Sequence, residues 1–575
     1  LTKLFNLSIN HADLPSIWKS AHIIPIPKPG KPLNLSSSYR PISLLSPAVK
    51  ILERLLLPFI NPPSLPLART QHGFRPFRST TTALLPIITQ AVNGFNQNKP
   101  PTRTAVVQLD ISKAFDSVDH TILLKQLSDS DMNSNVVRWL ATYLRGRTAS
   151  CLFRSSMSRS MIIHSGVPQG SVLSPSLFNY FTSDFPQAPL SESFADDFNI
   201  DASSPSLSSI TSSLNDSLAK VEIWADAKKL TIAPHKSSVI LFTPDPHQSN
   251  AHPQVFYKGD LIPLNKTPKN LGNVLDSRIN SSHHIADIDS SLSRSGNILK
   301  ALAGSTWGQS KETILATYKQ LLRPKMDFGC GIWYPNVSAT SVKKLQIHQN
   351  QALRLATGCH RMASIAHLHA ETSMLTVDRH LKLLCSQLLA STLRRSHVSH
   401  SVVTSPPGPR AMKQTLFSKS IDAVEKYLTD GIVLEVNYKR TLESLHTDAV
   451  SAEICEAAPN KLLGVLPPKI HPSEETLPRS HRCALSQLRS DYCPRLKSYQ
   501  LSIGKAEDDV CPECGSGIQN PNHLFECPSF PTDLSIRDLW SNPREAAVFI
   551  SNLPSFIRHL PPVPPLPFPH PGRPP

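Results

Sequence analysis

The sequence predicts an α+β fold, and three features lead to that prediction. Apolar residues flank the Asp-Asp pair at 196–197, which suits two short strands joined by a tight turn because aspartate tolerates turn geometry. Alternating apolar residues over 104–111 suit a further buried strand. Beyond about residue 290, apolar residues recur at helical spacing, as over 342–356, so this part of the chain is expected to be helical.

Length and charge limit the possible classes of protein. The chain has 575 residues, of which 40% are hydrophobic and 18% charged, so several globular domains are expected. The net charge is +16, and residues 1–100 hold eleven Lys and Arg against two Asp and Glu. A basic lobe of this kind favours a polyanionic partner. The alternative is that the excess charge serves only to keep the protein soluble.

Other compositional features concern the compartment. The chain contains no run of 18 apolar residues, so we expect no transmembrane helix. Its ten cysteines are scattered and then cluster near 511–527, which is unlike a secreted disulfide framework and favours a reducing compartment. The chain begins with Leu1 and is expected to be part of a longer product.

The first hundred residues combine short apolar segments with basic side chains. Residues 23–26 predict a strand that is followed by a basic turn with Lys28, and a helix is expected over 47–57. Arg40 stands beside an apolar segment, where a guanidinium suits a triphosphate; a surface salt bridge is the alternative. Two arginines alternate with aromatic rings over 71–80, a mixture that suits contact with nucleic acid.

A carboxylate lies near the end of the strand expected over 104–111. Ala105, Val107 and Leu109 share one face of this strand, and Asp110 falls on the other. A carboxylate at the end of a buried strand that leads into a helix is a frequent catalytic position. The alternative is a structural cap.

A bare loop precedes the Asp-Asp turn. Gly166 and Gly170 bracket Gln169, leaving a backbone that could lie under a base pair. The pair Asp196 and Asp197 then places two fixed carboxylates at one hairpin tip. Such a pair needs a positive partner, and Mg²⁺ prefers hard oxygen ligands. Taken alone, an exposed turn on a soluble protein is the simpler explanation.

Several of these segments together resemble one family. Asp110 with Phe115-Asp116, the loop 166–170 and Phe194-Ala-Asp-Asp197 resemble the palm of a reverse transcriptase. Further motifs are similar to those of LINE-like, non-LTR, jockey-like retrotransposon polymerases, namely Tyr39-Arg-Pro-Ile-Ser43, Gln71-His-Gly-Phe-Arg75 and Gln349-Asn-Gln-Ala-Leu-Arg354. Several independent motifs in one order are stronger than any single pattern.

The resemblance implies a right-hand polymerase with fingers, an antiparallel-sheet palm and a helical thumb. The expected organisation is fingers and palm over 1–280, thumb over 281–400, a linker and helical C-terminal region over 401–505, a zinc-knuckle-like module over 506–530 and a Pro-rich disordered tail over 553–575.

The resemblance also assigns roles to residues. It implies an RNA-directed DNA polymerase, a nucleotidyltransferase that extends a DNA primer 3′-hydroxyl with dNTPs on an RNA template. Asp110, Asp196 and Asp197 would bind two catalytic Mg²⁺ ions, and Lys236 would protonate the leaving pyrophosphate. The residues that would contact the substrates are Lys28, Arg40, Phe115, Gln169 and Gly170. Three departures from the family pattern, at Ala233, Asn270 and Asn273, put the support of the palm in doubt.

A second candidate metal site lies near the C-terminus. Cys511, Cys514, His523 and Cys527 have the spacing C-x2-C-x8-H-x3-C, which suits a closed tetrahedral Zn²⁺ site. The resemblance implies a structural zinc and a nucleic-acid-binding knuckle. Basic residues lie just upstream, at Arg489, Arg495 and Lys497.

The expected partners are template RNA, primer or target DNA and dNTPs, with no membrane, and the expected location is intracellular, in the nucleus and cytoplasm. Two alternatives stay open, a catalytically dead nucleic-acid-binding retroelement relic and a host-domesticated polymerase. The sequence does not define the oligomeric state.

Overall fold

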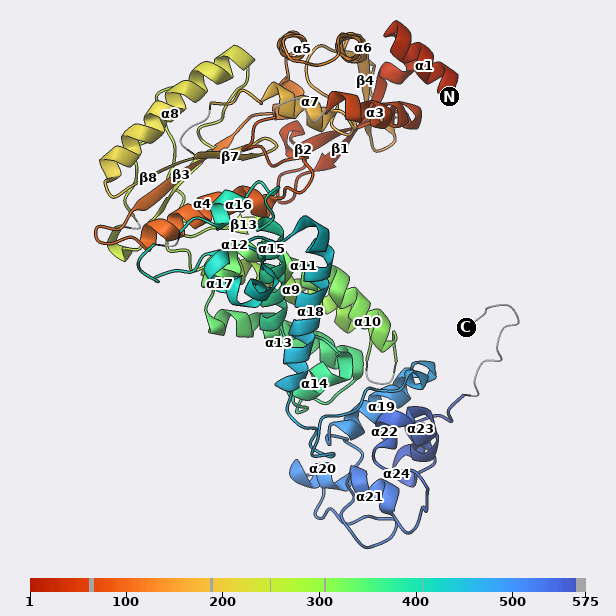
Figure 1. Cartoon of the computed structure of the whole chain (residues 1–575). Helices are drawn as coiled ribbons and strands as arrows, with labels where there is room; N and C mark the ends of the chain where they lie inside the picture. Colours follow the sequence, from red (N-terminus) through yellow and green to blue (C-terminus); the bar gives the residue numbers. More distant parts are fainter. Residues whose placement is uncertain (62–66, 187–189, 249, 305–306, 407, 565–575) are drawn as a thin grey trace.

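The computed structural model describes residues 1–61, 67–186, 190–248, 250–304, 307–406 and 408–564. A lobe built from two sheets and their helices forms the N-terminal half, a layer of helices follows below it, and a smaller helical unit lies at the far end (Figure 1). Within these described ranges, none of the helices combines the length and apolar character needed to cross a membrane.

The central sheet carries the Asp-Asp hairpin. Its four antiparallel strands run in the order β7-β8-β3-β9. Their bounds are Leu190–Phe194, Asp197–Ser204, Arg103–Asp110 and Ser238–Phe242. Val107 on β3 lies in the core beneath α8 (Leu207–Lys228), whereas Val106 lies in the core that includes α4 (Thr80–Phe95). The alternation predicted for 104–111 is therefore confirmed, with one helix covering each face.

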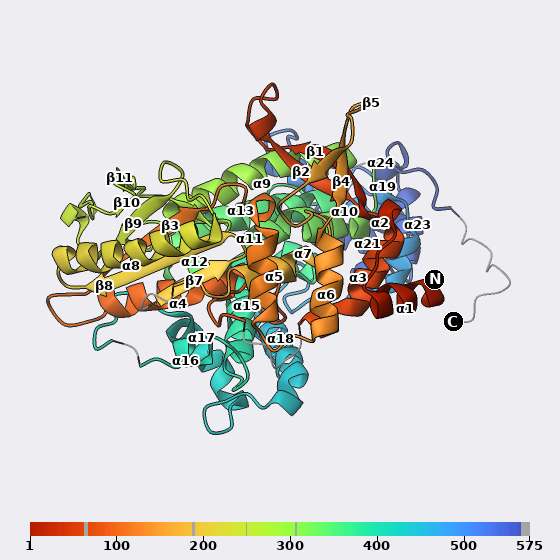
Figure 2. The same ribbon diagram turned by 90° about the horizontal axis from the view of Figure 1, so that it is seen from above.

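The second sheet forms the fingers. It has the order β2-β1-β4-β5, and β6 also pairs with β4; in the view from above, β5 lies at a tip that projects beyond the helices (Figure 2). In chain order β1, β2, β4, β5 and β6 span Ser20–Pro27, Tyr39–Leu44, Arg147–Phe153, Ser156–Met157 and Met161–Ile163. The strand predicted over 23–26 is thus confirmed.

Helices surround the two sheets in the N-terminal half. They are α1 (Thr2–His11), α2 (Ser16–Lys19), α3 (Pro47–Ile60), α5 (His120–Ser128), α6 (Ser134–Leu144) and α7 (Ser174–Phe181). The helix expected over 47–57 is confirmed, and it begins at a proline, whose missing N–H costs nothing at a helix start.

The thumb is a layer of packed helices. Its members are α9 (Ser282–Leu302), α10 (Lys311–Thr317), α11 (Arg323–Asp327), α12 (Cys330–Trp333), α13 (Ala339–Thr357), α14 (Ile365–Thr372) and α15 (Val377–Thr392). The structure extends this layer beyond residue 400, because α17 (Leu416–Val424) and α18 (Tyr438–Cys455) pack against α15 in the same core. The expected boundary at 400 is therefore too early.

The C-terminal unit has its own core. It contains α19 (Arg479–Arg489), α20 (Lys497–Ser502), α21 (Pro521–Glu526), α22 (Asp538–Ser541), α23 (Pro543–Ser551) and α24 (Pro554–Ile557). Phe525 and Phe556 both lie in this core, so the expected module at 506–530 is part of a larger fold. The expected disordered tail is also wrong at its start, because Phe556 is fully buried; residues 565–575 lie outside the described residues.

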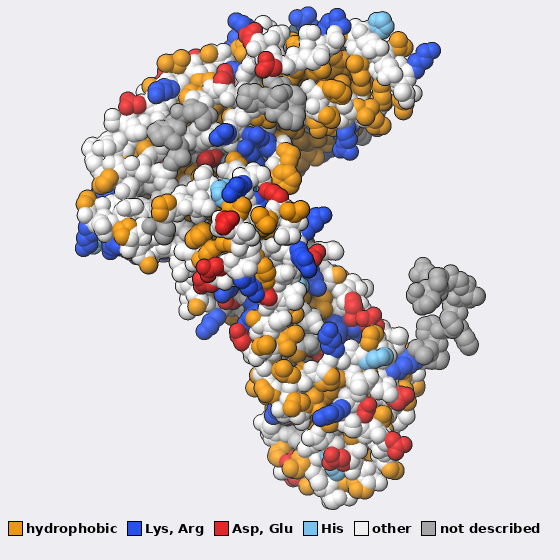
Figure 3. Space-filling model, in the orientation of Figure 1, with side chains coloured by type: hydrophobic (Ala, Val, Ile, Leu, Met, Phe, Trp, Pro, Cys, Tyr) orange, Lys and Arg blue, Asp and Glu red, His pale blue; other side chains and the backbone are white. Residues whose placement is uncertain are grey.

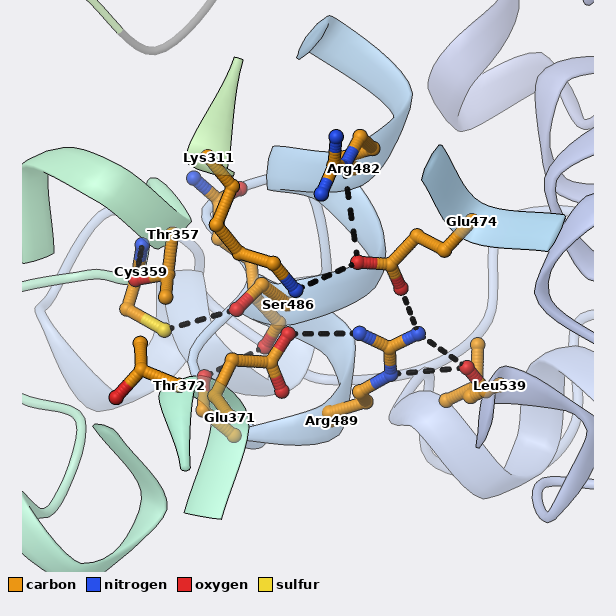
Figure 4. A network of polar contacts seen from close by, with 12 residues as sticks. Lys311, Thr357, Cys359, Glu371, Thr372, Glu474, Arg482, Ser486, Arg489 and Leu539 are labelled. Carbon is orange, nitrogen blue, oxygen red and sulfur yellow. Dashed lines mark hydrogen bonds and ion pairs between the residues drawn. The ribbon is translucent and has the colours of Figure 1, made fainter. Parts of the chain in front are cut away.

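A buried ion-pair network joins this unit to the thumb (Figure 4). The Arg489 guanidinium is 0% exposed and donates a hydrogen bond of 2.7 Å to Glu371 on α14. It also pairs with Glu474, and its Nε donates to the Leu539 carbonyl at 2.9 Å. Lys311 at the start of α10 reaches Glu474 at 3.1 Å. Arg489 is therefore committed to protein contacts, which removes it from the basic residues expected to face nucleic acid.

Candidate active site

The hairpin tip differs by one residue from the expected Asp-Asp turn. Phe194 pairs with Asp197, so Ala195 and Asp196 form the two-residue turn and Asp197 is the first residue of β8. Ala195 has φ +56°, in the left-handed region that alanine seldom adopts. Asp196 thus stands at the tip, and Asp197 belongs to the strand.

The aspartates of β3 and β8 meet at this edge of the sheet. Asp110 ends β3 directly opposite Asp197 in the antiparallel register. Burial, together with the charges of Asp196 and Asp110, raises the pKa of Asp197 to about 6. Burial also raises the pKa of Asp196, while Arg40 acts in the opposite direction. Carboxylates that oppose each other's ionisation in this way suit a bound cation, which would relieve the repulsion.

A short turn holds Lys236 beside Asp110. The Lys236 Nζ lies 3.6 Å from Asp110 Oδ2. The Ala233 N–H donates to the Asp110 carbonyl at 2.9 Å, and the Asp110 N–H donates to Ser237 Oγ at 3.1 Å. The contact from Ala233 is made by its backbone and does not depend on the side chain at that position. Asp110, Asp197 and Lys236 line one cavity of about 390 Å³, which residues 263–269 close on another side.

Phe115 lies in an aromatic cluster with Phe74 and Phe178. Its ring stacks on Phe178 with centroids 4.6 Å apart and planes 17° apart, and it meets Phe74 edge-on at 6.2 Å. Phe115 is half-buried, whereas Phe178 is fully buried. The buried Phe178 ring thus holds one face of the Phe115 ring in place.

The loop 166–170 joins β2 to the segment that follows β3. Gln169 donates a side-chain hydrogen bond of 3.0 Å to Asp116, and its carbonyl accepts from the Ser43 N–H at 2.7 Å. Gly170 has φ +122°, and a Cβ there would lie 2.6 Å from the Ser43 carbonyl oxygen. Only glycine fits this position, so the close approach of the loop to β2 explains Gly170.

The two basic residues of the fingers differ in their surroundings. Arg40 is exposed on β2, opposite Ile26, and its positive charge acts to lower the pKa of the Asp196 carboxyl. Lys28 follows β1 and donates to the Ser37 carbonyl at 3.0 Å. No recorded contact joins Lys28 to the aspartates among the described residues.

The segment beginning at Gln71 is the main feature that sequence reasoning missed. Gln71 and His72 are buried against β7, and Arg78 donates to the Gln71 carbonyl at 2.7 Å. Arg75 donates to the Ala68 carbonyl at 2.7 Å. These arginines thus brace the segment itself, and the expected nucleic-acid contact is left to exposed Phe74 and its neighbours. The Gln71 side chain also hydrogen-bonds Ala195, which lies 124 residues away, so no local pattern marks this contact.

The C-terminal ligands converge as their spacing predicts. Cys511 Sγ lies 4.0 Å from Cys527 Sγ, and Cys514 Sγ lies 3.4 Å from His523 Nε2. Zn–S bonds of about 2.3 Å place two sulfurs of a tetrahedral site about 3.8 Å apart, so the set fits Zn²⁺. Hydrogen bonds from Ser516 hold the pKa of the Cys514 thiol at about 6, which favours the thiolate.

The aspartates are spaced more widely than this Cys₃His set. Within the part of the chain that the structure describes, the Cys₃His set is the one group of three or more His, Cys, Asp or Glu residues whose ligand atoms all lie within 4.8 Å of one another.

Comparison with known proteins agrees with this geometry. Residues 26–274 match the family model of the reverse transcriptase (RNA-dependent DNA polymerase). The chain is 30% identical over 390 residues to a probable RNA-directed DNA polymerase from transposon X-element of Drosophila melanogaster, covering 66% of this chain and 42% of that protein. It is 30% identical over 374 residues to the RNA-directed DNA polymerase from mobile element jockey of the same species, covering 62% and 40%.

The chain thus spans less than half the length of these relatives. Among solved structures, telomerase from Candida tropicalis in complex with a fragment of telomeric RNA covers 78% of this chain and 67% of its own, at 12% identity and a TM-score of 0.35, a likeness too weak to assign a fold. The matching family model and the transposon relatives rest instead on sequence: residues 26–274 match the reverse transcriptase family, and the chain is similar to the RNA-directed DNA polymerases of non-LTR retrotransposons.

Proposed function

We propose that this protein is an RNA-directed DNA polymerase that extends a DNA primer 3′-hydroxyl with deoxynucleotides on an RNA template. The observation that carries the proposal is the position of Asp110 directly opposite Asp197, with Asp196 at the adjacent tip and Lys236 at 3.6 Å from Asp110. Three carboxylates and one ammonium at the edge of a buried sheet are the groups that phosphoryl transfer needs.

Asp110, Asp196 and Asp197 would hold two Mg²⁺ ions. Their oxygens are hard donors, and the pKa of Asp197 is raised by burial and by repulsion from Asp196 and Asp110, a repulsion that bound cations would relieve. Such ions, when bound, would activate the primer hydroxyl and neutralise the triphosphate. Asp110 and Asp197 lie on paired strands, so the sheet would fix the position of the bound cations.

The remaining side chains would orient and neutralise the nucleotide. Arg40, whose charge acts on the Asp196 carboxyl, would hold the triphosphate, together with Lys28, which follows β1 in the fingers. Lys236 would donate a proton to the leaving pyrophosphate. Gln169 and Gly170 would form the floor under the new base pair, since their loop is fixed to β2.

The nucleic acid would lie between the fingers, the palm and the thumb. In the space-filling view the upper lobe overhangs the thumb and leaves a hollow on one side, with Lys and Arg side chains on both sides of it (Figure 3). Basic side chains around a hollow suit a phosphate backbone. The Cys₃His site would bind structural Zn²⁺ and make the C-terminal unit a second nucleic-acid contact.

Primer extension tests the proposed activity. A labelled DNA primer annealed to an RNA template is incubated with the purified chain, dNTPs and Mg²⁺. We expect extension to the end of the template, dependence on the complementary dNTP and loss of product with EDTA. A folded chain that binds the duplex and extends no primer would favour the non-catalytic relic.

A further inference from the structure

The Gln71 side chain grips the backbone of the turn that carries Asp196. Its Oε1 accepts from the Ala195 N–H at 2.8 Å, and its Nε2 donates to the Ala195 carbonyl at 3.1 Å. The same Oε1 accepts from the Gly73 N–H at 2.8 Å. One amide group thus satisfies both backbone groups of a single residue in the turn.

Ala195 depends on this grip for two reasons. It is 6% exposed, so its N–H and carbonyl would stay unpaired without Gln71, and unpaired buried groups are costly. It also has φ +56°, which an L-residue with a Cβ adopts only against a steric cost. The paired amide holds Ala195 in this conformation, which sets the direction in which the next residue, Asp196, leaves the turn.

The segment that carries Gln71 is itself fixed against β7, the strand that leads into the turn. Gln71 pairs in parallel with Ser193, and the His72 N–H donates to the Ser193 carbonyl at 2.8 Å. The His72 ring lies 3.0 Å from Glu192, and a Cβ on Gly73 would lie 2.3 Å from the Ala195 nitrogen. The backbone pairing with Ser193, the contact of the His72 ring with Glu192 and the close approach of Gly73 to Ala195 together hold the Gln71 amide against the turn.

We propose that Gln71 is a positioning residue for the reaction, acting through Ala195 to hold Asp196 and Asp197 in register with Asp110. This rests on the proposed polymerase function of the aspartates. Gln71 touches no substrate in this account, and its contribution is the preorganisation of the turn. A misplacement of about 1 Å at a reacting centre can cost about a hundredfold in rate, so a small shift of the turn is enough.

Two substitutions of Gln71 and one control test this role. Gln71→Ala removes both contacts. Gln71→Glu keeps the acceptor for the Ala195 N–H and replaces the donor by a carboxylate oxygen, which regains a donor only when protonated. Gln90→Ala is the control, because Gln90 also hydrogen-bonds β8, at Ser203, near its far end. Each variant is assayed by single-turnover nucleotide addition, normalised to the fraction of active sites.

We expect the rate per active site to fall tenfold to a hundredfold in Gln71→Ala and the Mg²⁺ concentration for half-maximal rate to rise, with Gln90→Ala near wild type. The rate of Gln71→Glu relative to wild type should rise as the pH is lowered, because the protonated carboxyl of this variant can again donate to the Ala195 carbonyl. A loss confined to the active fraction, with wild-type rate and Mg²⁺ dependence per site, would make Gln71 merely structural and overturn the proposal.

Hydrogen exchange separates this inference from the proposed function. In full-length protein without nucleotide, peptides covering 193–197 should exchange at least tenfold faster in Gln71→Ala than in wild type or Gln90→Ala. If exchange at 193–197 is faster in Gln71→Ala but the wild type extends no primer, the proposed polymerase function is wrong, while the contact of Gln71 with the turn stands. Unchanged exchange at 193–197 in Gln71→Ala would reject the grip itself, whatever the activity of the wild type.

Discussion

Asp110 and Asp197 stand opposite each other on neighbouring antiparallel strands, one at the end of β3 and the other at the start of β8. This pairing places two carboxylates at the same edge of the sheet before any ligand arrives. Burial, together with repulsion from Asp196 and Asp110, raises the pKa of Asp197 to about 6. Repulsion between these carboxylates therefore lowers the stability of the folded protein when they are ionised.

The first prediction follows from that raised pKa. A carboxyl whose pKa is higher in the folded than in the unfolded state favours folding when protonated, so Asp197 lowers stability as pH rises from about 4 through about 6. Asp197→Asn should therefore raise the free energy of unfolding by about 1–2 kcal/mol at neutral pH in EDTA, with little effect near pH 4. Calorimetry at both pH values measures this. Equal stability of variant and wild type at neutral pH would contradict it, and Asp216→Asn on the exposed face of α8 serves as control.

Phe115 should set the choice of sugar. A ring beneath the incoming sugar leaves no space for a 2′-hydroxyl, so Phe115→Val should raise ribonucleotide incorporation relative to deoxynucleotide incorporation, while deoxynucleotide extension falls modestly. The measurement is the ratio of the two kcat/KM values. Phe95→Leu is the control, because Phe95 is fully buried in the core that includes α4 and should lower stability by about 1–3 kcal/mol without changing the ratio. An unchanged ratio in Phe115→Val removes it from the sugar site.

Lys236 should act on the chemical step. Loss of a general acid typically slows a reaction by about 10²-fold or more, so Lys236→Gln should lower the single-turnover rate by about that factor with a small change in dNTP affinity. Lys220→Gln, on an exposed position of α8, controls for charge. A rate within twofold of wild type would leave Lys236 as a neighbour of Asp110 only.

The Cys₃His site should bind one Zn²⁺ per chain. Cys514→Ser should lose the metal and loosen the C-terminal unit, because α21 carries His523 and also supplies Phe525 to its core. Cys455→Ser, at an exposed cysteine outside the set, should keep the metal. Elemental analysis and proteolysis of the full chain measure both effects. Full zinc content in Cys514→Ser would show that the spacing is accidental.

Local patterns predicted much of the palm and its aspartates. The alternation over 104–111 placed Asp110 on the face opposite Val107, and the apolar residues around 196–197 marked the hairpin. These predictions succeeded because strand periodicity and turn chemistry act over a few residues. They missed the one-residue shift of the turn, since the left-handed conformation falls on Ala195, a residue with no intrinsic preference for it.

Long-range contacts account for what the sequence did not predict. Gln71 lies 124 residues from Ala195, and its motif suggested nucleic acid because polar and aromatic residues are mixed there. Arg489 suggested a basic surface, yet it is buried between Glu371 and Glu474, whose positions are far apart in sequence. Phe556 lies in a Pro-rich stretch and is held by a core that forms only when the whole C-terminal unit folds.

Single-turnover addition of one deoxynucleotide on an RNA template, compared between Asp196→Asn and wild type, tests the central claim most directly. The substitution removes a charge with little change in volume, so folding and binding of the primer–template duplex should persist while addition falls by at least about a thousandfold, since several kcal/mol of transition-state stabilisation are lost. Asp216→Asn should match wild type. Addition by Asp196→Asn at a rate close to wild type would contradict the account.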